Sequence, residues 1–355
     1  VIDADSYTKE GDRVVEDLLR NIPGIEIEDD GKIKIGGREI EKVMVENDDF
    51  FNKGYGILTQ SMPNSPVDKV EVIYNYSEND LLKGVQNSDK IALNLKLKEG
   101  AKRSWFGNVE AAHETTDSFY EFRSNLLNFG KKNKYFLLSD LNNIGSDSFE
   151  RVQEVLKNSN ENSSGDLLLN EVSAETPLGF ETGLTNFRKE RTNINDSELI
   201  SLNTILNPTE NVKVKVLSFL NFDEIELDKG IYQDLDGVNP PITNSEVWEL
   251  TKNSVLAIGQ VRLDWRPSKS ARVVSTNNYR FLNQEDRNRI EFNENLALEG
   301  LDTDREYSYN ETAYTKKLNE KSVLQLSGSY LFDKIPQRYS LDRFFYSDLD
   351  RKSVV

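Results

Sequence analysis

The feature that most constrains the fold is a set of long segments in which apolar and polar residues alternate. The clearest is NVKVKVLSFLNF, residues 211–222. A period of two is typical of a β-strand with one apolar face. Comparable segments of about 10 to 14 residues recur from Ser104 onward, whereas typical strands have about 5 to 6 residues. The sequence therefore predicts an extended antiparallel sheet whose apolar face meets either a protein core or lipid.

The spacing of these segments favours a particular kind of sheet. Short polar turns such as 130–133, 207–211 and 266–270 alternate with longer polar loops such as 157–166. Short turns at one end and long loops at the other are typical of outer-membrane barrels. One helix is expected within this part, at 148–158. The predicted strands cover residues 104–115, 119–129, 134–144, 167–180, 198–207, 211–222, 246–265, 271–282, 288–298, 305–318 and 322–332.

Composition excludes several classes of protein. The chain has no cysteine, so it has neither disulfides nor thiolate chemistry. Its formal net charge of −17 and pI near 4.7 argue against nucleic acid as a partner. No run reaches the ~18 to 20 apolar residues of a membrane-spanning helix. A mean hydropathy of −0.62 is still compatible with a membrane barrel, because only alternate strand residues face lipid.

The first 100 residues have a different character and predict a compact mixed α/β unit. Apolar residues in 14–22 share one helical face, and Pro23-Gly24 ends that helix. Residues 25–35 predict a β-hairpin that turns at Asp30-Gly31. Further strands are expected at 37–45, 67–74 and 90–97.

The order of these elements resembles the plug domain of TonB-dependent outer-membrane receptors. VIDAD (1–5) looks like the opening strand of the plug, and VVEDLLRNIPGIEI (14–27) is similar to its helix, Pro-Gly break and strand. SPVDKVEVIY (65–74) and LLKGVQNSDKIALNLKLKEG (81–100) look like the segments that complete it. Residues 105–145 resemble the first barrel strands, in particular those of Bacteroidetes-type members.

The resemblance implies a plug domain at 1–100 followed by the N-terminal part of an antiparallel transmembrane β-barrel at 101–355. It implies a location in the bacterial outer membrane, contact with outer-membrane lipid, and a TonB-type energy-transducing complex as partner. The function implied is ligand binding and energised import. A family barrel has 22 strands, whereas about ten or eleven are predicted here, no TonB box precedes Val1, and the chain ends in RKSVV, so we expect an incomplete barrel.

Candidate ligand-binding residues follow the strand at 37–45. In the resemblance this loop lies near the plug apex, which faces incoming ligand. The alternative is a solvated connection with two buried phenylalanines, which the sequence favours about two to one. The candidates are Asp48, Asp49, Phe50, Phe51, Lys53 and Tyr55.

No catalytic set is expected, and the chain is predicted not to be an enzyme. His113 is the only histidine, and no GxSxG motif accompanies it. Acid-rich stretches such as Asp234 to Gly237 lack the twelfth-position Glu of an EF-hand, so neither a metal nor a cofactor is predicted. Two alternatives to transport remain, namely a non-transporting surface-binding or scaffold barrel and a soluble carbohydrate-active enzyme.

The barrel hypothesis assigns a side to every residue of the opening segment. The lipid-facing residues are predicted to be Val212, Val214, Val216, Ser218, Leu220 and Phe222. The residues facing the lumen or plug are predicted to be Lys213, Lys215, Leu217, Phe219 and Asn221. Because Leu217 and Phe219 are apolar, we expect the inner side of this strand to pack against the plug. Arginine at position 216 is expected to cost ~2 to 4 kcal/mol, and arginine at 215 almost nothing.

Overall fold

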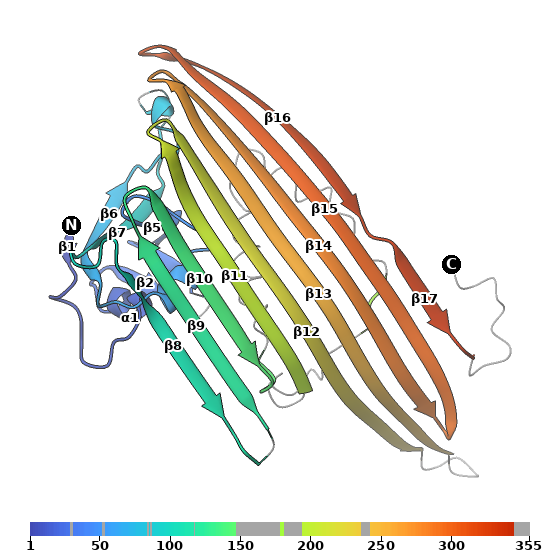
Figure 1. Ribbon diagram of the computed structural model, residues 1–355. Coiled ribbons are helices and arrows are strands. Elements are labelled where there is room, and N and C mark those ends of the chain that lie inside the picture. Colours follow the sequence, from blue (N-terminus) through green and yellow to red (C-terminus); the bar gives the residue numbers. More distant parts are fainter. Residues whose placement is uncertain are drawn as a thin grey trace.

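The described part of the chain forms one large antiparallel sheet and two small sheets that lie against one side of it (Figure 1). The structure is a computed structural model. It describes residues 1–28, 31–51, 54–83, 85, 87–116, 118–146, 178–180, 194–235 and 242–343. No helix among these residues is both long and apolar enough to cross a membrane.

The predicted helix is confirmed as α1 (Val15–Arg20), which buries Val15, Leu18 and Leu19. The carboxylate of Asp17 accepts hydrogen bonds from the backbone N–H groups of Arg13 and Val14, which satisfies amides that have no partner within the helix. The hairpin is also confirmed, with β2 (Ile25–Ile27) pairing antiparallel to β3 (Ile33–Ile35).

The single strand predicted at 37–45 is wrong, because the chain changes sheet at Ile40. β4 (Arg38–Glu39) continues the hairpin sheet beside β3. β5 (Lys42–Val45) joins the second small sheet, where it runs parallel to β7 (Ile91–Leu97). That sheet has the order β1-β6-β7-β5, with β1 (Ile2–Asp3) and β6 (Val67–Tyr74) antiparallel to each other.

Two short helical elements of the small unit were not predicted. Helix α2 (Gly56–Ser61) begins after Tyr55, which makes no side-chain capping bond. The 3₁₀ helix η1 (Asp80–Leu82) is capped by the side chain of Asn79. Neither segment has the apolar period of a long helix, so the sequence pattern gave no signal for them.

The large sheet confirms the predicted antiparallel architecture. Its order is β16-β15-β14-β13-β12-β11-β10-β9-β8, and β17 pairs with β15. Every neighbouring pair is antiparallel. The strands are β8 (Trp105–His113), β9 (Tyr120–Phe129), β10 (Asn133–Asn142), β11 (Ile194–Thr209), β12 (Val212–Leu235), β13 (Ile242–Ser268), β14 (Ala271–Phe292), β15 (Asn295–Asn319), β16 (Ser322–Lys334) and β17 (Gln337–Leu341).

Several strands are longer than predicted. β12, β14 and β15 have 24, 22 and 25 residues, about twice the predicted lengths, and β13 has 27 residues, beyond the predicted 246–265. In β12 the apolar side changes after Phe222. Acidic residues then occupy the former apolar positions (Glu224, Glu226), and Ile225 and Leu227 occupy the other side. This change of phase hid the continuation of the strand.

The strand predicted at 288–298 is also wrong. Residues 288–298 instead form the end of β14, a turn and the start of β15. The turn residues are Asn293 and Glu294, which both have positive φ. The helix expected at 148–158 lies outside the described residues, as does nearly all of the strand expected at 167–180.

The sheet does not close into a barrel within the described residues. Its edges are β8 on one side and β16 with β17 on the other, and these edges do not pair (Figure 1). The predicted incomplete barrel is therefore seen here as an open wall, with the small unit beside the N-terminal strands.

The two sides of this wall differ as predicted for β12. Leu217 and Phe219 are buried and belong to the same apolar cluster as Val45 and Phe50 of the small unit. On the opposite side, Leu220 and Phe222 are exposed. We call the side toward the small unit the inner face and the other side the outer face.

Candidate functional site

The candidate site begins at a tight turn that follows β5. The backbone groups of Val45 and Asp48 bond to each other in both directions, at 2.8 and 3.1 Å. Glu46 and Asn47 between them both have positive φ, as in a type I′ turn. Glu46 is held there because its N–H donates to the carbonyl of Leu95 and its carboxylate accepts from the N–H of Leu97. The turn directs Asp48 and Asp49 toward the wall.

Asp48 bridges two lysines of the inner face. The Nζ of Lys134 on β10 lies 2.7 Å from its carboxylate, and Lys213 on β12 also donates to it. The same Lys134 ammonium donates to the carbonyls of Val45 and Glu46, at 3.2 and 3.1 Å. One buried lysine of the wall therefore binds both the backbone and the side chain of the turn.

Asp49 makes a second ion pair, which is more deeply buried. Its carboxylate lies 2.8 Å from the Nζ of Lys215 on β12 and 3.3 Å from the Nζ of Lys42 on β5. The side chains of Lys42 and Lys215 are 4% and 7% exposed. The carboxylate thus joins one cation of the small unit to one cation of the wall.

The two phenylalanines form the apolar half of the contact. Phe50 packs edge-on against Phe129 of β9, with ring centroids 5.7 Å apart. Phe51 packs edge-on against Phe136 of β10 at 5.1 Å. Phe50 and Phe51 are both buried. Such aromatic pairs stabilise a contact by about 0.5 to 1.5 kcal/mol beyond the area they bury.

The structure brings four of the six candidate residues, Asp48, Asp49, Phe50 and Phe51, into the contact between the small unit and the wall. Tyr55 is buried, and its hydroxyl accepts a hydrogen bond from the N–H of Ile33 at 3.1 Å. Lys53 lies outside the described residues. Binding of a ligand by this loop stays a prediction.

A second group of acids, not predicted from the sequence, lies in the segment 75–82. Glu78 pairs with Arg262 of β13, and Asp80 pairs with Arg266 at 2.8 Å. Asn79 donates from its amide to the hydroxyl of Thr315 on β15 at 2.9 Å. The sequence signal that could have indicated this group is the set of Lys and Arg residues at inner positions of β12 to β14. Strand alternation assigns these cations to the inner side but does not reveal which acids they pair with.

Both groups of acids border one small cavity of about 200 Å³. The small unit contributes Asp48, Asp49 and Glu78, and the wall contributes Lys213, Lys215 and Arg262. The contact has mainly one polarity, because carboxylates of the small unit face cations of the wall; Lys42 of the small unit and Asp264 of the wall are the exceptions. We call these paired residues the charged contact.

Electrostatics keep the acids of the charged contact ionised. Burial raises the pKa of the Asp49 carboxyl, but Lys215 and Lys42 outweigh burial and hold that pKa well below its usual range. The pKa of Asp48 is lowered in the same way, by Lys134 and Lys213 against burial. For Lys42, burial lowers the pKa, whereas Asp49 and Glu78 raise it further, above its ordinary value.

These shifts predict a contact that resists mild acid. A carboxyl with a depressed folded pKa adds stability that is fully present above its unfolded pKa of about 4 and is lost below it. Lys42, with a raised pKa, adds stability below about pH 10. We expect hydrogen exchange in residues 42–51, corrected for intrinsic rates, to show equal protection at pH 7 and pH 5. Loss of protection by pH 5, while 91–97 stays protected, would contradict this.

The structure changes one expectation from the sequence. Arginine at position 215 was expected to be almost silent, as at an open lumenal position. Lys215 is instead buried and paired with Asp49. Arginine and lysine differ in shape and hydrogen-bonding geometry, so this exchange is not neutral at a closely packed ion pair. Lys213, with a 44% exposed side chain, is the better inner-face control.

Comparisons with known proteins give structural similarity only. No family model and no curated protein sequence matches the chain. Among solved structures, it is similar to the ferric-catecholate import receptor Fiu from E. coli, with 11% identity, a TM-score of 0.26 and coverage of 96% of this chain and 66% of that one.

Two further similar structures are the ferric preacinetobactin receptor BauA from Acinetobacter baumannii and the ferric yersiniabactin uptake receptor FyuA from Yersinia pestis. They have 9% identity each, with TM-scores of 0.29 and 0.27. The matches cover 93% and 96% of this chain, and 58% and 61% of theirs. The chain spans less than two thirds of the length of these three structures, and at such TM-scores they establish neither family nor function.

Proposed function

We propose that the chain is the plug and the first part of the barrel wall of a TonB-dependent receptor in the bacterial outer membrane. The observation that carries this proposal is the difference between the two faces of the large sheet. On β12 and β13 the outer face is apolar over a limited band, whereas the inner face is charged and packs against the small unit. A wall between lipid and a plugged lumen requires this division.

The height of the apolar band supports the proposal. On β12 the band runs from Val212 to Phe222, and on β13 from Val255 to Trp265. At about 3.3 Å per residue and a tilt of about 45°, either run rises about 25 Å, the height of the apolar band of outer-membrane barrels. Beyond Phe222 the outer positions are acidic, at Glu224, Glu226 and Asp228. The long strands then continue as a wall outside the bilayer.

An aromatic pair lies on the outer face near the beginning of the wall. Trp105 on β8 stacks on Tyr135 of β10, with ring centroids 6.0 Å apart, and is more than half exposed. Aromatic side chains at this kind of position are typical of the girdle where a barrel meets the lipid headgroups. Phe106, the next residue of β8, lies on the inner face against Phe129.

The contacts of the small unit with the wall support its proposed role as a plug. It binds the wall through the charged contact and through the phenylalanine cluster. In the proposed mechanism, ligand binds from outside to the plug and the barrel loops, and a TonB-type complex pulls on the plug to open a path. No covalent chemistry is needed. Residues 1–100 would be the plug and 101–355 the N-terminal part of the barrel.

A disulfide between plug and wall tests import directly. The chain has no cysteine, so Asn79→Cys with Thr315→Cys introduces one defined pair where the native side chains hydrogen-bond at 2.9 Å. If the plug must move, the oxidised full-length protein is expected to lose import, and dithiothreitol is expected to restore it. Import is measured as growth of a strain that lacks the native gene, with iron chelates, glycans, peptides or cobalamin as the limiting nutrient.

The two single-cysteine variants are the matched controls and should support growth under the same oxidising conditions. Growth supported equally by the oxidised double variant would contradict a moving plug. Normal growth of the deletion strain on every nutrient, together with recovery of the protein in the outer-membrane fraction of the parent strain, would favour a non-transporting binding or scaffold barrel.

A further inference from the structure

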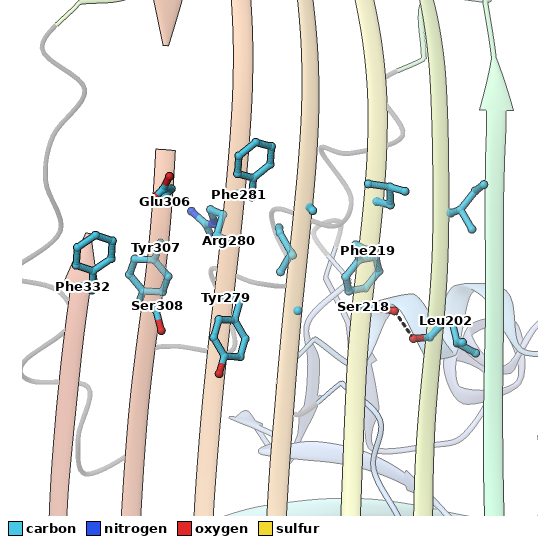
Figure 2. Close-up of a pocket in the computed structure, with 15 residues that line it drawn as sticks. Leu202, Ser218, Phe219, Tyr279, Arg280, Phe281, Glu306, Tyr307, Ser308 and Phe332 are labelled. Carbon is cyan, nitrogen blue, oxygen red and sulfur yellow. Dashed lines mark hydrogen bonds between the residues drawn. The ribbon is translucent and has the colours of Figure 1, made fainter. Parts of the chain in front are cut away.

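The inner face changes character at β14, at the edge of its contact with the small unit. Phe219 on β12 and Ile258 on β13 lie directly opposite each other and belong to the apolar cluster shared with the small unit. The next residue in the same cross-strand row is Arg280 on β14, and Tyr307 on β15 follows it. Figure 2 shows Arg280 and Tyr307 on these neighbouring strands. A cation and a phenol therefore begin where the apolar packing ends.

Arg280 differs from the other arginines on the inner face of β13 to β15, because each of those has a carboxylate partner. The pairs are Arg262 with Glu78, Arg266 with Asp80, Arg272 with Asp264, and Arg305 with Asp333. Arg280 forms no hydrogen bond or ion pair with any residue that the structure describes. A guanidinium group is always charged and carries five N–H donors. This one therefore has its full binding capacity left.

The surroundings of Arg280 do not compensate its charge. The carboxylate in its cross-strand row is Asp333 on β16, opposite Tyr307. Both oxygens of Asp333 accept hydrogen bonds from Arg305, at 3.0 and 2.7 Å. Glu306 precedes Tyr307 on the strand and therefore points to the outer face. Two guanidinium groups thus share one inner-face carboxylate, and Arg305 already binds it through both oxygens.

The polar atoms of Arg280 and Tyr307 remain accessible. Both side chains are partly exposed. The Tyr307 hydroxyl makes no hydrogen bond with a described residue, and its ring lies under the Arg305 guanidinium, 5.9 Å from centroid to Cζ. Neither that hydroxyl nor a nitrogen of Arg280 is completely buried without a partner. The two side chains therefore present unused N–H and O–H donors to the lumen.

From this arrangement we propose that Arg280 and Tyr307 form a subsite for an oxyanion, a carboxylate or phosphate group, of a ligand that enters the lumen. The planar guanidinium fork matches two oxygens of such a group, and the phenol supplies a further donor. The row that contains the subsite continues into the apolar cluster of the small unit, so a ligand held there lies beside the proposed plug. This inference rests on the proposed import function and names the chemical class of the ligand.

Chemical labelling of arginine tests the subsite before the ligand is known. Phenylglyoxal, which modifies free guanidinium groups, is applied to the full-length protein in detergent micelles, and mass spectrometry quantifies each arginine. Arg280 is expected to react. Citrate or inorganic phosphate at about ten times its dissociation constant should slow that reaction about tenfold relative to glycerol. Protection by only one of the two anions assigns the group as carboxylate or as phosphate.

Arg289 is the matched control, since it lies on the outer face of the same strand with a 42% exposed side chain. Its reaction should be the same in citrate, phosphate and glycerol. Tyr307→Phe removes one donor to the anion and should raise the anion concentration that gives half-protection of Arg280 about tenfold. The backbone and the aromatic ring stay unchanged in this variant, so folding is not at issue.

The growth test of import supplies the second readout. The nutrient whose use depends on the gene is expected to carry a carboxylate or a phosphate. Arg280→Gln should raise the concentration of that nutrient needed for half-maximal growth about 100-fold, the upper range for loss of a hydrogen bond to a charged group. Arg289→Gln should leave it unchanged.

The outcomes separate the subsite from import. Equal modification of Arg280 in citrate, phosphate and glycerol would overturn the subsite, as would an Arg280 that reacts as slowly as the paired Arg305. A gene-dependent nutrient with neither carboxylate nor phosphate, used equally well by Arg280→Gln, would overturn the ligand class. Protection of Arg280 by either anion, in a protein whose deletion changes growth on no nutrient, would overturn import alone and support the subsite.

Discussion

Replacing Asp49 by asparagine is expected to lower the free energy of unfolding by about 3 to 5 kcal/mol, the usual result of removing one partner of a buried ion pair. The Asp49 carboxylate lies 2.8 Å from Lys215 and 3.3 Å from Lys42, and both lysine side chains are almost completely buried. An asparagine keeps the shape but removes the charge that both ammonium groups face. Denaturant titration of the full-length protein in lipid vesicles measures the difference.

The control is Asp5→Asn, which removes another ion pair between an acid and a lysine of the small unit. Asp5 lies 2.8 Å from Lys98, but its side chain is 72% exposed. Exposed pairs contribute about 0 to 1 kcal/mol, so we expect little change. A cost for Asp49→Asn as small as that for Asp5→Asn would show that the charged contact does not hold the small unit to the wall.

A double variant tests whether the loss of stability in Asp49→Asn comes from the uncompensated charge of the buried lysines. Replacing both members of a buried pair by apolar residues of similar volume is often neutral or stabilising. Asp49→Leu with Lys215→Met is therefore expected to recover part of the loss. Recovery should be incomplete, because Lys42 also faces Asp49 and would keep only the more distant carboxylate of Glu78, at 3.7 Å, and the ring of Tyr76.

Local patterns in the sequence predicted much of the fold. Three features depend only on neighbouring residues, and the structure confirms all three. They are the apolar positions of α1, the hairpin that passes through Gly31, and the alternation in β6 and β7. The sides of Leu217 and Phe219 were predicted because two apolar residues on the otherwise polar face of β12 required a protein partner. Local periodicity was sufficient for these predictions, and no knowledge of the rest of the chain was needed.

Features that depend on distant parts of the chain were not predictable in this way. Asp48 and Lys213 are 165 residues apart, and nothing in either local pattern indicates the other. Lys215 appeared to be an open lumenal lysine because the small unit that buries it comes more than 160 residues earlier. The length of β12 was missed because its apolar side changes at the edge of the band, where the strand is proposed to leave the bilayer.

Val216→Arg is expected to lower the free energy of unfolding by about 2 to 4 kcal/mol, the cost of a cation near the middle of a bilayer on the lipid face of a barrel. Val216 lies on the outer face of β12, midway along the apolar band, between Thr204 on β11 and Val261 on β13. An arginine there would have Thr204 and Val261 directly opposite it, and neither can compensate its charge. The cost should fall if the bilayer is thinned, because the guanidinium then reaches the headgroups more easily.

The most direct test of the central claim, that this sheet separates lipid from a plugged lumen, compares Val216→Arg with Lys213→Arg in the same vesicles. Lys213 lies on the same strand but on the inner face, its side chain is 44% exposed, and arginine keeps the charge that faces Asp48. We predict a loss of about 2 to 4 kcal/mol for Val216→Arg and a change within about 0.5 kcal/mol for Lys213→Arg. Equal effects of the two substitutions would contradict the assignment of the outer face to lipid.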